Sequence, residues 1–241
     1  MADSVLQVSL VTPTYNEREN IGPLCEEIFG LLAGVPDIDL ELIVVDDNSP
    51  DGTGAAADAL AARYPVRVIH RAGKLGLGSA VMAGFALSER PYLGVIDADL
   101  SHDPAILPDL IHGLRDYDLT VGSRFGATSR VEKWAWHRKL ISHLGVGAAR
   151  ALTGVEDPLS GYFFLHRNVL GDFRLTSTGY KILLEILVKG RYRRHLSIPF
   201  VFRNRQFSQS KLNWREHMLF LKQILLFSLT RSRHRRSGPP A

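Results

Sequence analysis

Two aspartates that end an apolar run in the middle of the chain most constrain what this sequence can fold into. Residues Tyr92–Ile96 read as a short buried strand after Pro91, and Asp97 and Asp99 follow it directly. In an extended chain, residues two apart point to the same side, so both carboxylates would face one way and Ala98 would face back. Two like charges held that close repel each other unless a cation lies between them or one carboxylate takes a proton.

A divalent cation is the ligand that such a pair predicts. Mg²⁺ takes one or two carboxylates and completes its shell with water and substrate phosphates. The alternative is that Asp99 or Asp103 only caps a helix beginning at Pro104, and Asp103 before Pro104 does match an N-cap followed by proline. Asp97 and Asp99 are not needed for that cap, so we predict a metal site at this pair.

Apolar strands alternate with helices along the first half of the chain. The pattern predicts strands at 8–11, 40–45, 66–69, 92–96 and 118–121, with helices at about 21–32, from Thr53 to Tyr64, and toward Leu87. This rhythm indicates an α/β fold with a mostly parallel, Rossmann-like sheet and helices on both faces. Because each polar cluster follows a strand, we expect these clusters to converge on one crevice at one edge of the sheet.

That crevice is suited to a nucleotide. Asp46 and Asp47 can accept hydrogen bonds from a base or from ribose hydroxyls, and Glu17 is a further acceptor at the neighbouring strand end. Asp51 reads as a turn and helix cap. The glycines of Gly73–Gly78 do not match the dinucleotide fingerprint in spacing or place, so they allow close backbone approach to a ligand or only a turn. The sequence contains no Walker-type phosphate loop, which argues against a P-loop phosphotransferase.

Composition bounds the compartment and the domain count. A chain of 241 residues with 45% hydrophobic residues can build one large domain with an appendage. Cys25 is the only cysteine, which excludes an internal disulfide and fits a reducing, cytoplasmic compartment. We expect no signal peptide and no membrane span, because no apolar run approaches the required length. The net charge of +4 resides in the arginines of Arg231–Ala241, which hold no acid.

A basic stretch with interleaved tryptophans follows the fifth predicted strand. Arg138 and Ser142 lie four apart on a predicted helix, hence on one face, and with Arg124 they would form a phosphate clamp. Arg130 and Lys133 read as a solvated loop. Basic residues interleaved with aromatics also occur in nucleic-acid sites, but the neutral body and the acidic crevice argue against nucleic acid.

The chain resembles the polyprenol-phosphate (dolichol-phosphate) mannose synthases, which are family 2 inverting glycosyltransferases. The resemblance covers about Val8 to Phe227, and its most specific segments are Arg138–Ser142 and Ser210–Leu212. The other segments that carry it are Pro13–Glu17, Val45–Thr53, Asp97–His102, Gly122–Arg124, Asp157–Phe163 and Gly179–Glu185.

The resemblance implies a GT-A fold and transfer of mannose from GDP-mannose to a polyprenyl phosphate of the dolichyl type, with inversion and with Mg²⁺ or Mn²⁺. Ser101 stands where related enzymes often carry a metal-shell glutamine, and Ser208 replaces a loop glycine. The implied catalytic residues are Asp97, Asp99, Arg124 and Arg138; the implied donor contacts are Pro13, Tyr15, Glu17, Asp46, Asp47, Asp97, Ala98, Arg205 and Lys211; the acceptor-phosphate contacts are Arg124, Arg138 and Ser142; and the metal ligands are Asp97, Asp99 and Ser101.

Three segments follow from this interpretation: a catalytic domain over 1–212, an amphipathic helix over 213–230 and a basic tail over 231–241. The helix either lies in a membrane interface or packs on the domain's own core. Helix and tail together predict peripheral attachment to the cytoplasmic face of a membrane, with a separate membrane-anchoring subunit as a further possible partner. Rival interpretations are transfer of glucose or another sugar to the same lipid phosphate, and a nucleotide-binding regulatory subunit without turnover.

Overall fold

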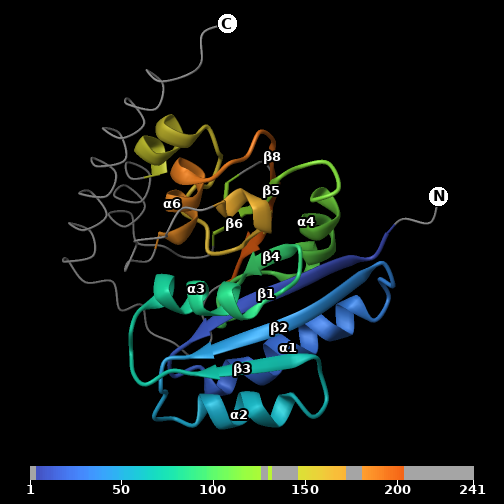
Figure 1. The fold of residues 1–241 in the computed structure, drawn as a ribbon, viewed down its shortest axis with the longest axis vertical. Helices are drawn as coiled ribbons and strands as arrows, with labels where there is room; N and C mark the ends of the chain where they lie inside the picture. The colour runs from blue at the N-terminus through green and yellow to red at the C-terminus, as the bar shows by residue number, and fades with distance from the viewer. Residues whose placement is uncertain (1–3, 126–129, 132–145, 172–180, 204–241) are drawn as a thin grey trace, which may run out of the picture.

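The computed structural model describes residues 4–125, 130–131, 146–171 and 181–203 (Figure 1). The described chain forms a seven-stranded sheet in the order β3-β2-β1-β4-β7-β5-β8 and a separate pair, β6 and β9. The strands are β1 (Leu6–Thr14), β2 (Ile38–Asp46), β3 (Val66–His70), β4 (Tyr92–Val95), β5 (Leu119–Ser123), β6 (Arg130–Val131), β7 (Phe163–His166), β8 (His195–Pro199) and β9 (Val201–Phe202).

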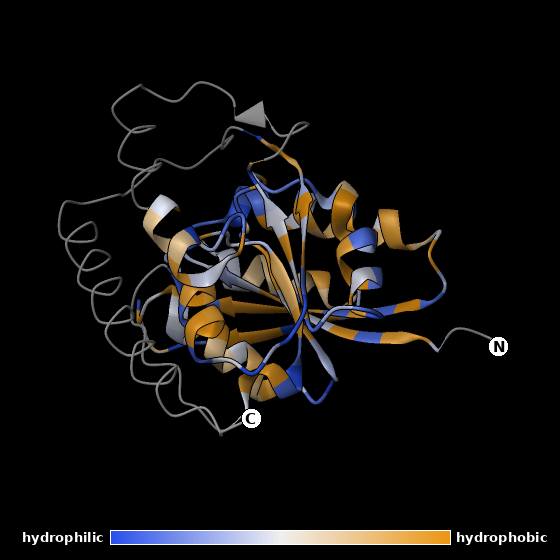
Figure 2. Cartoon of the chain, turned by 90° about the horizontal axis from the view of Figure 1, so that it is seen from above, coloured by the Kyte–Doolittle hydropathy of each residue, from blue (hydrophilic) through white to orange (hydrophobic). Residues whose placement is uncertain are grey.

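Helices cover both faces of this sheet, as the alternation of strands and helices predicts. They are α1 (Arg18–Leu32), α2 (Thr53–Leu60), α3 (Leu77–Leu87), α4 (Leu107–Gly113) and α6 (Ile182–Lys189), with the 3-10 helices η1 (Pro104–Ile106) and η2 (Arg167–Leu170) and a helical stretch at residues 146–153. One core cluster packs α1, α2 and α4 on one face, and a second packs α3 and α6 on the other. Figure 2 shows the central strands largely orange, as buried parallel strands should be.

The five predicted strands are confirmed as β1 to β5, with ends that differ by a few residues. β1 pairs in parallel with β2 and β4, and β2 pairs in parallel with β3. The carboxyl ends of these strands therefore lie along one edge, which is where the polar loops begin. The predicted extent of one helix is wrong: it ends at Leu60 rather than Tyr64. Pro65 disfavours helical backbone at Tyr64, and the chain must turn there to enter β3.

β7 is the one strand of the main sheet that runs antiparallel to its neighbours. It lies between β4 and β5, with Phe163 opposite both Val95 and Val121. Because its direction is reversed, the beginning of β7 lies at the edge where β4 and β5 end. The segment that precedes it, Asp157–Tyr162, therefore arrives at the same edge as the polar loops of the parallel strands.

Candidate active site

The turns after β1 and β2 begin the site. Thr14, at the end of β1, donates through Oγ1 to the Asp46 carboxylate at 3.2 Å. Asn16 and Asn48 both have left-handed backbone, with φ of 61° and 57°, a conformation that asparagine tolerates better than most residues. The Asn16 backbone N–H also donates to Ser49 Oγ at 3.0 Å, so the two turns support each other.

Asp46 and Asp47, the predicted donor contacts at the end of β2, are buried and bonded within the protein. Asp46 accepts hydrogen bonds from Thr14 and from the Ser49 N–H and hydroxyl groups. Asp47 accepts from Arg71 at 2.7 Å and from the N–H groups of Leu75 and Gly76 at 3.0 and 3.1 Å. A carboxylate offers about four lone-pair sites, so each keeps capacity for a ligand while it shapes the loops.

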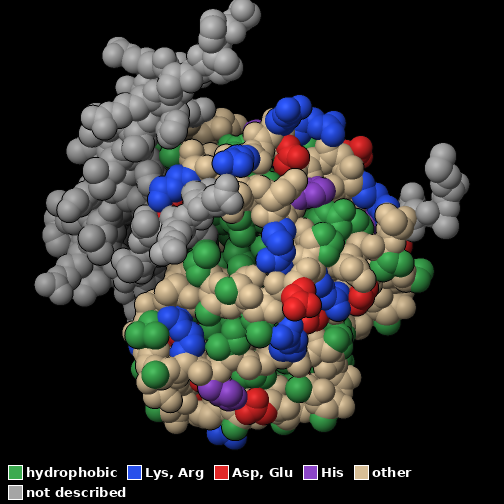
Figure 3. Space-filling view, viewed as in Figure 1, with side chains coloured by type: hydrophobic (Ala, Val, Ile, Leu, Met, Phe, Trp, Pro, Cys, Tyr) green, Lys and Arg blue, Asp and Glu red, His purple; other side chains and the backbone are tan. Residues whose placement is uncertain are grey.

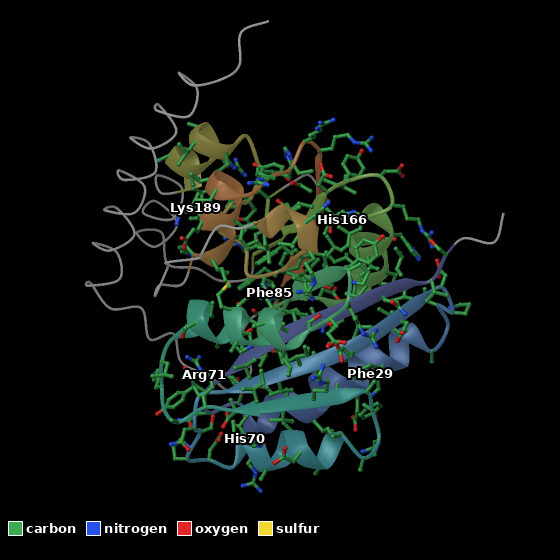
Figure 4. All side chains as sticks on the ribbon, in the orientation of Figure 1. Phe29, His70, Arg71, Phe85, His166 and Lys189 are labelled. Atoms are coloured by element: carbon green, nitrogen blue, oxygen red, sulfur yellow. The ribbon has the colours of Figure 1, made fainter. Side chains whose placement is uncertain are left out.

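Arg71, at the end of β3, was not predicted from the sequence and organises the glycine-containing loop (Figure 4). Its guanidinium bonds Asp47 and also reaches Ser79 Oγ in α3 at 2.7 Å. Gly76 has a φ of +98°, so this loop needs a glycine in order to turn. The turn brings the Lys74 ammonium to 4.1 Å from the centre of the Tyr15 ring, a predicted donor contact.

Glu17 and Pro13 complete the predicted contacts on this side of the site. The Glu17 carboxylate accepts a hydrogen bond from Asn20 at 2.6 Å, and its backbone N–H donates to Thr53 at 2.9 Å. Pro13 is half-buried within β1. Asp51 lies in the turn before α2, as predicted, and its carboxylate accepts from the Thr53 N–H at 3.0 Å, but the N-cap position of α2 is Gly52 and not Asp51. Burial would raise the pKa of Asp51, but the hydrogen bonds from Thr53 and from the Arg18 N–H lower it.

The loop that carries the paired aspartates leaves β4 through a tight turn. β4 ends at Val95, and Ala98 and Asp99 lie in a turn, so the extended alternation expected for Asp97 and Asp99 is wrong. Leu100 adopts a left-handed φ of 59°, and the Asp99 carboxylate accepts from the Ser101 N–H at 3.0 Å and from its hydroxyl at 2.5 Å. These local hydrogen bonds, rather than strand geometry, orient Asp99.

Asp97 and Asp103 border the same loop. The Asp97 side chain keeps 31% of its surface exposed, while Asp99 is 5% exposed. The Asp97 N–H donates to Nδ1 of buried His102 at 3.4 Å, and the His102 ring packs against Tyr162 with centroids 5.4 Å apart. Asp103 accepts from the Ala105 N–H at 3.1 Å and caps η1, which confirms that alternative for Asp103 alone.

Arg124, which follows β5, is paired with a buried aspartate from the loop before β7. Its Nε and Nη2 donate to Asp157 at 2.8 and 2.9 Å, and its backbone N–H donates to the same carboxylate at 3.1 Å. Burial alone would lower the pKa of the Arg124 guanidinium, but the hydrogen bonds and charge of Asp157, with the charge of Asp97, raise it. The charges of Arg124 and Asp97 therefore interact across the site.

Gly161 brings the loop before β7 against the Asp97 carboxylate. A Cβ built on Gly161 would lie 2.7 Å from Asp97 Oδ2 and 3.1 Å from its Cγ, closer than real contacts allow. The same loop is hydrogen-bonded to β5, since the Gly122 N–H donates to the Tyr162 carbonyl at 2.8 Å. Asp157 and Gly161 thus join the Arg124 end of the site to the Asp97 end. From the sequence, the segment that contains Asp157 and Gly161 could be recognised only through its resemblance to a known family.

The donor set fits a hard divalent cation that keeps water and substrate oxygens. Within the described ranges, no group of three or more His, Cys, Asp or Glu side chains could by itself hold a metal ion. Two carboxylates are the usual protein contribution to Mg²⁺ bound with substrate phosphates, and Asp97 and Asp99 supply two. The Ser101 hydroxyl donates a hydrogen bond to Asp99, so it supports that carboxylate while its own oxygen lone pairs stay available.

Several predicted features lie outside the described residues. These are Arg138, Ser142, Arg205 and Lys211, and the segments predicted over 213–230 and 231–241. None of the described helices has the length and apolar character of a membrane span. Across the described part of the face in Figure 3, basic and acidic side chains are interspersed, as a neutral body predicts.

The fold is that of GT-A glycosyltransferases, with the carboxylates of the candidate site along one edge of the sheet. The solved structure of glucosyl-3-phosphoglycerate synthase from Mycobacterium tuberculosis, with Mn²⁺, uridine diphosphate and glucosyl-3-phosphoglycerate, superposes with a TM-score of 0.67. It covers 94% of this chain and 80% of that one at 23% identity, so it speaks for the fold alone.

The chain belongs to glycosyl transferase family 2, whose sequence model matches residues 9–174. It is 39% identical over 224 residues to the dolichol-phosphate mannosyltransferase of Pyrococcus furiosus, an alignment with 91% of this chain and 63% of that longer protein. It is 37% identical to the Saccharomyces cerevisiae dolichol-phosphate mannosyltransferase, over 91% of this chain and 86% of that one. The polyprenol monophosphomannose synthase of Mycolicibacterium smegmatis is 36% identical, with shares of 85% and 80%. The resemblance to polyprenol-phosphate mannose synthases is thereby confirmed.

Proposed function

We propose that the protein transfers mannose from GDP-mannose to a polyprenyl phosphate, with inversion, at the cytoplasmic face of a membrane. The single observation that carries this proposal is the placement of Arg124 and Asp97 at one sheet edge, where one loop bonds Arg124 through Asp157 and lies against the Asp97 carboxylate at Gly161. A cationic group for an acceptor phosphate and an acidic group for a donor's metal-bound diphosphate are thus brought together. The relatives' names supply the sugar and the lipid.

The acceptor half of the reaction needs charge neutralisation rather than a general base. A phosphate monoester has a second pKa of about 6, so it is mostly dianionic near neutral pH and already nucleophilic. Arg124 pairs with Asp157 through Nε and Nη2, and among the described residues this leaves its Nη1 edge without a hydrogen-bond acceptor. A guanidinium edge matches two phosphate oxygens. Arg138 and Ser142 would complete the clamp and aim the phosphate at the anomeric carbon.

The donor half uses the edge formed by β1, β2 and β4. Tyr15, Glu17, Asp46 and Asp47 line the nucleotide side, and Pro13 and Ala98 provide backbone beside it. Asp97 and Asp99 would hold Mg²⁺ or Mn²⁺, which would stabilise the negative charge of the departing diphosphate. Arg205 and Lys211 would add positive charge over the same diphosphate. The nucleophile and the leaving group then lie on opposite faces of the sugar, which gives inversion.

Attachment to the membrane would come from the C-terminal residues. An amphipathic helix over 213–230 followed by the arginines of Arg231–Ala241 provides an apolar face and a basic cluster. Such a pair of signals supports stable peripheral binding to an anionic leaflet. A separate anchoring subunit is the alternative that a liposome assay would reveal.

A panel of donors and acceptors tests the proposal directly. Purified full-length protein is incubated with GDP-mannose, GDP-glucose, UDP-glucose or UDP-mannose, with and without farnesyl phosphate or a long-chain prenyl phosphate, and lipid products are identified by mass. We expect mannosyl-phosphate lipid from GDP-mannose only, and GDP release that depends on the prenyl phosphate. Preference for a glucose donor would overturn the sugar assignment, and nucleotide binding without turnover would indicate a regulatory subunit.

A further inference from the structure

Asp157 is a fully buried carboxylate whose hydrogen bonds, among the residues that the structure describes, go to one partner. Both oxygens are used by Arg124, through Nε to Oδ2, Nη2 to Oδ1 and the backbone N–H to Oδ2. Burial would raise the pKa of Asp157, but the hydrogen bonds and charge of Arg124, with the charge of Lys181, lower it, so the group is ionised in the folded protein. An ionised acid this deep in the protein is costly unless its partner is fixed in return.

The geometry of the pair determines where the free edge of Arg124 points. Asp157 accepts hydrogen bonds from the Nε/Nη2 edge of the guanidinium, which is planar and rigid. Fixing the Nε/Nη2 edge therefore fixes the direction of the Nη1 edge as well. The rings of Phe125 and Phe202 also lie near the guanidinium, each with its centre 5.9 Å from Arg124 Cζ.

Asp157 is itself held on a rigid loop. Arg150, in the helical stretch at 146–153, donates through Nε to the carbonyl of Glu156, the preceding residue. The Ser160 N–H bonds the Asp157 carbonyl at 3.2 Å. Two residues after Ser160, the loop meets β5 through the Tyr162 carbonyl and the Gly122 N–H. The carboxylate is thus tied to the strand that delivers Arg124.

We propose that Asp157 is a positioning residue for the acceptor: it holds one edge of the Arg124 guanidinium so that the other edge receives the phosphate monoester of the lipid. This inference rests on the proposed function, because it takes the bound anion to be the acceptor phosphate. Asp157 acts through Arg124 and not as a general base, since a dianionic phosphate has no proton to give up in the attack.

The test measures acceptor binding apart from turnover. Binding of farnesyl phosphate to the enzyme loaded with GDP and Mg²⁺ is measured by calorimetry for wild type, Asp157→Asn and the control Asp118→Asn. Asp118 is a carboxylate at the start of β5, remote from the site, that accepts the Arg193 and Arg194 N–H groups. We expect Asp157→Asn to weaken farnesyl phosphate binding by about tenfold or more while GDP affinity stays within about twofold. The control should change neither.

Two further variants keep the inference testable if Asp157→Asn fails to fold. Asp157→Glu keeps the ion pair but lengthens it by one methylene, so it should also weaken acceptor binding. Arg124→Lys loses the planar edge, and adding Asp157→Asn to it should have little further effect on acceptor binding, because the two residues act as a unit.

Each contrary result has a definite meaning. Independent, additive effects of Asp157→Asn and Arg124→Lys, or equal losses of GDP and acceptor affinity, would overturn the positioning role. So would unchanged acceptor binding with a lower kcat and a lost acidic limb in the pH profile, the pattern of a general base. Failure of the wild type to bind farnesyl phosphate or to glycosylate any prenyl phosphate would overturn the proposed function as well. Normal wild-type transfer with an unaffected Asp157→Asn enzyme would overturn only this inference.

Discussion

Replacing Gly161 by alanine should damage catalysis through one displaced carboxylate while leaving the fold intact. The φ of Gly161 does not lie in the left-handed region, so alanine suits its backbone. The added Cβ would lie 2.7 Å from Asp97 Oδ2, whereas ordinary contacts begin at 3.4 Å. The Asp97 carboxylate therefore has to move by about 0.7 Å to restore an ordinary contact.

That displacement is large for a group that holds a metal or a diphosphate. Catalytic groups tolerate roughly 0.5 Å, and a misplacement of about 1 Å can cost about 100-fold in rate. We expect kcat/KM to fall by about 10- to 100-fold, equivalent to about 1.4–2.7 kcal/mol of transition-state stabilisation. Folding stability should change little, because the lower entropy of the unfolded alanine chain contributes about 0.4–1 kcal/mol in favour of the fold and offsets the tight contact.

The assay is initial-rate sugar transfer to farnesyl phosphate at several Mg²⁺ concentrations, with thermal unfolding measured in parallel with and without GDP and Mg²⁺. We expect a higher metal requirement and a smaller stabilisation by GDP and Mg²⁺ in Gly161→Ala. Gly147→Ala is the matched control, since Gly147 lies in the helical stretch at 146–153 and a Cβ there meets nothing within 4 Å. A Gly161→Ala enzyme with wild-type kinetics and metal response would refute the assignment of Asp97 to the reaction centre.

Four other predictions follow from the site and the sequence. Asp99→Asn keeps an acceptor oxygen for the two Ser101 hydrogen bonds and removes one of two like charges, so thermal stability without ligand should hold or rise. Turnover and metal-dependent GDP-mannose binding should be lost, and near-normal activity at ordinary metal concentration would contradict the metal site. Arg138→Lys should impair acceptor kinetics by about 2–5 kcal/mol while sparing donor affinity, and the reverse pattern would move Arg138 to the diphosphate. The pKa of Asp157 is lowered in the folded protein relative to about 3.9 unfolded, so its ionised form stabilises the fold above about pH 4 and this contribution is lost as the pH falls through the folded value. The free energy of unfolding, measured with a denaturant, should therefore fall more steeply below about pH 4 in wild type than in Asp157→Asn. Equal slopes would count against the ion pair. Deleting Arg231–Ala241 should release protein from anionic liposomes and raise KM for a long-chain prenyl phosphate but not for a soluble one; persistent co-sedimentation at moderate salt would point to a partner subunit.

The fold class and the position of several candidate site residues at one sheet edge followed from the sequence because they depend on short-range patterns. Continuous apolar runs identify parallel strands that are buried on both faces, and the polar residues at their ends must meet at one edge. Asp46 and Asp47 after β2, and Asp97 after β4, were located by this rule alone. The rule did not extend to the relative direction of Asp97 and Asp99, because the Asp99–Ser101 hydrogen bonds turn the chain after β4 ends.

The partners of the site residues were decided only by the tertiary structure. Asp157 is 33 positions from Arg124, and nothing local in either segment shows that one carboxylate saturates one edge of that guanidinium. The pairing exists because β7 enters the sheet antiparallel between β4 and β5, so the loop before it lies at the edge where those strands end. Strand order and direction depend on how the whole core packs, and that packing is a long-range property. Sequence therefore determined which chemistry the edge can offer, and packing determined which of those groups are neutralised, aimed or left free to meet a substrate.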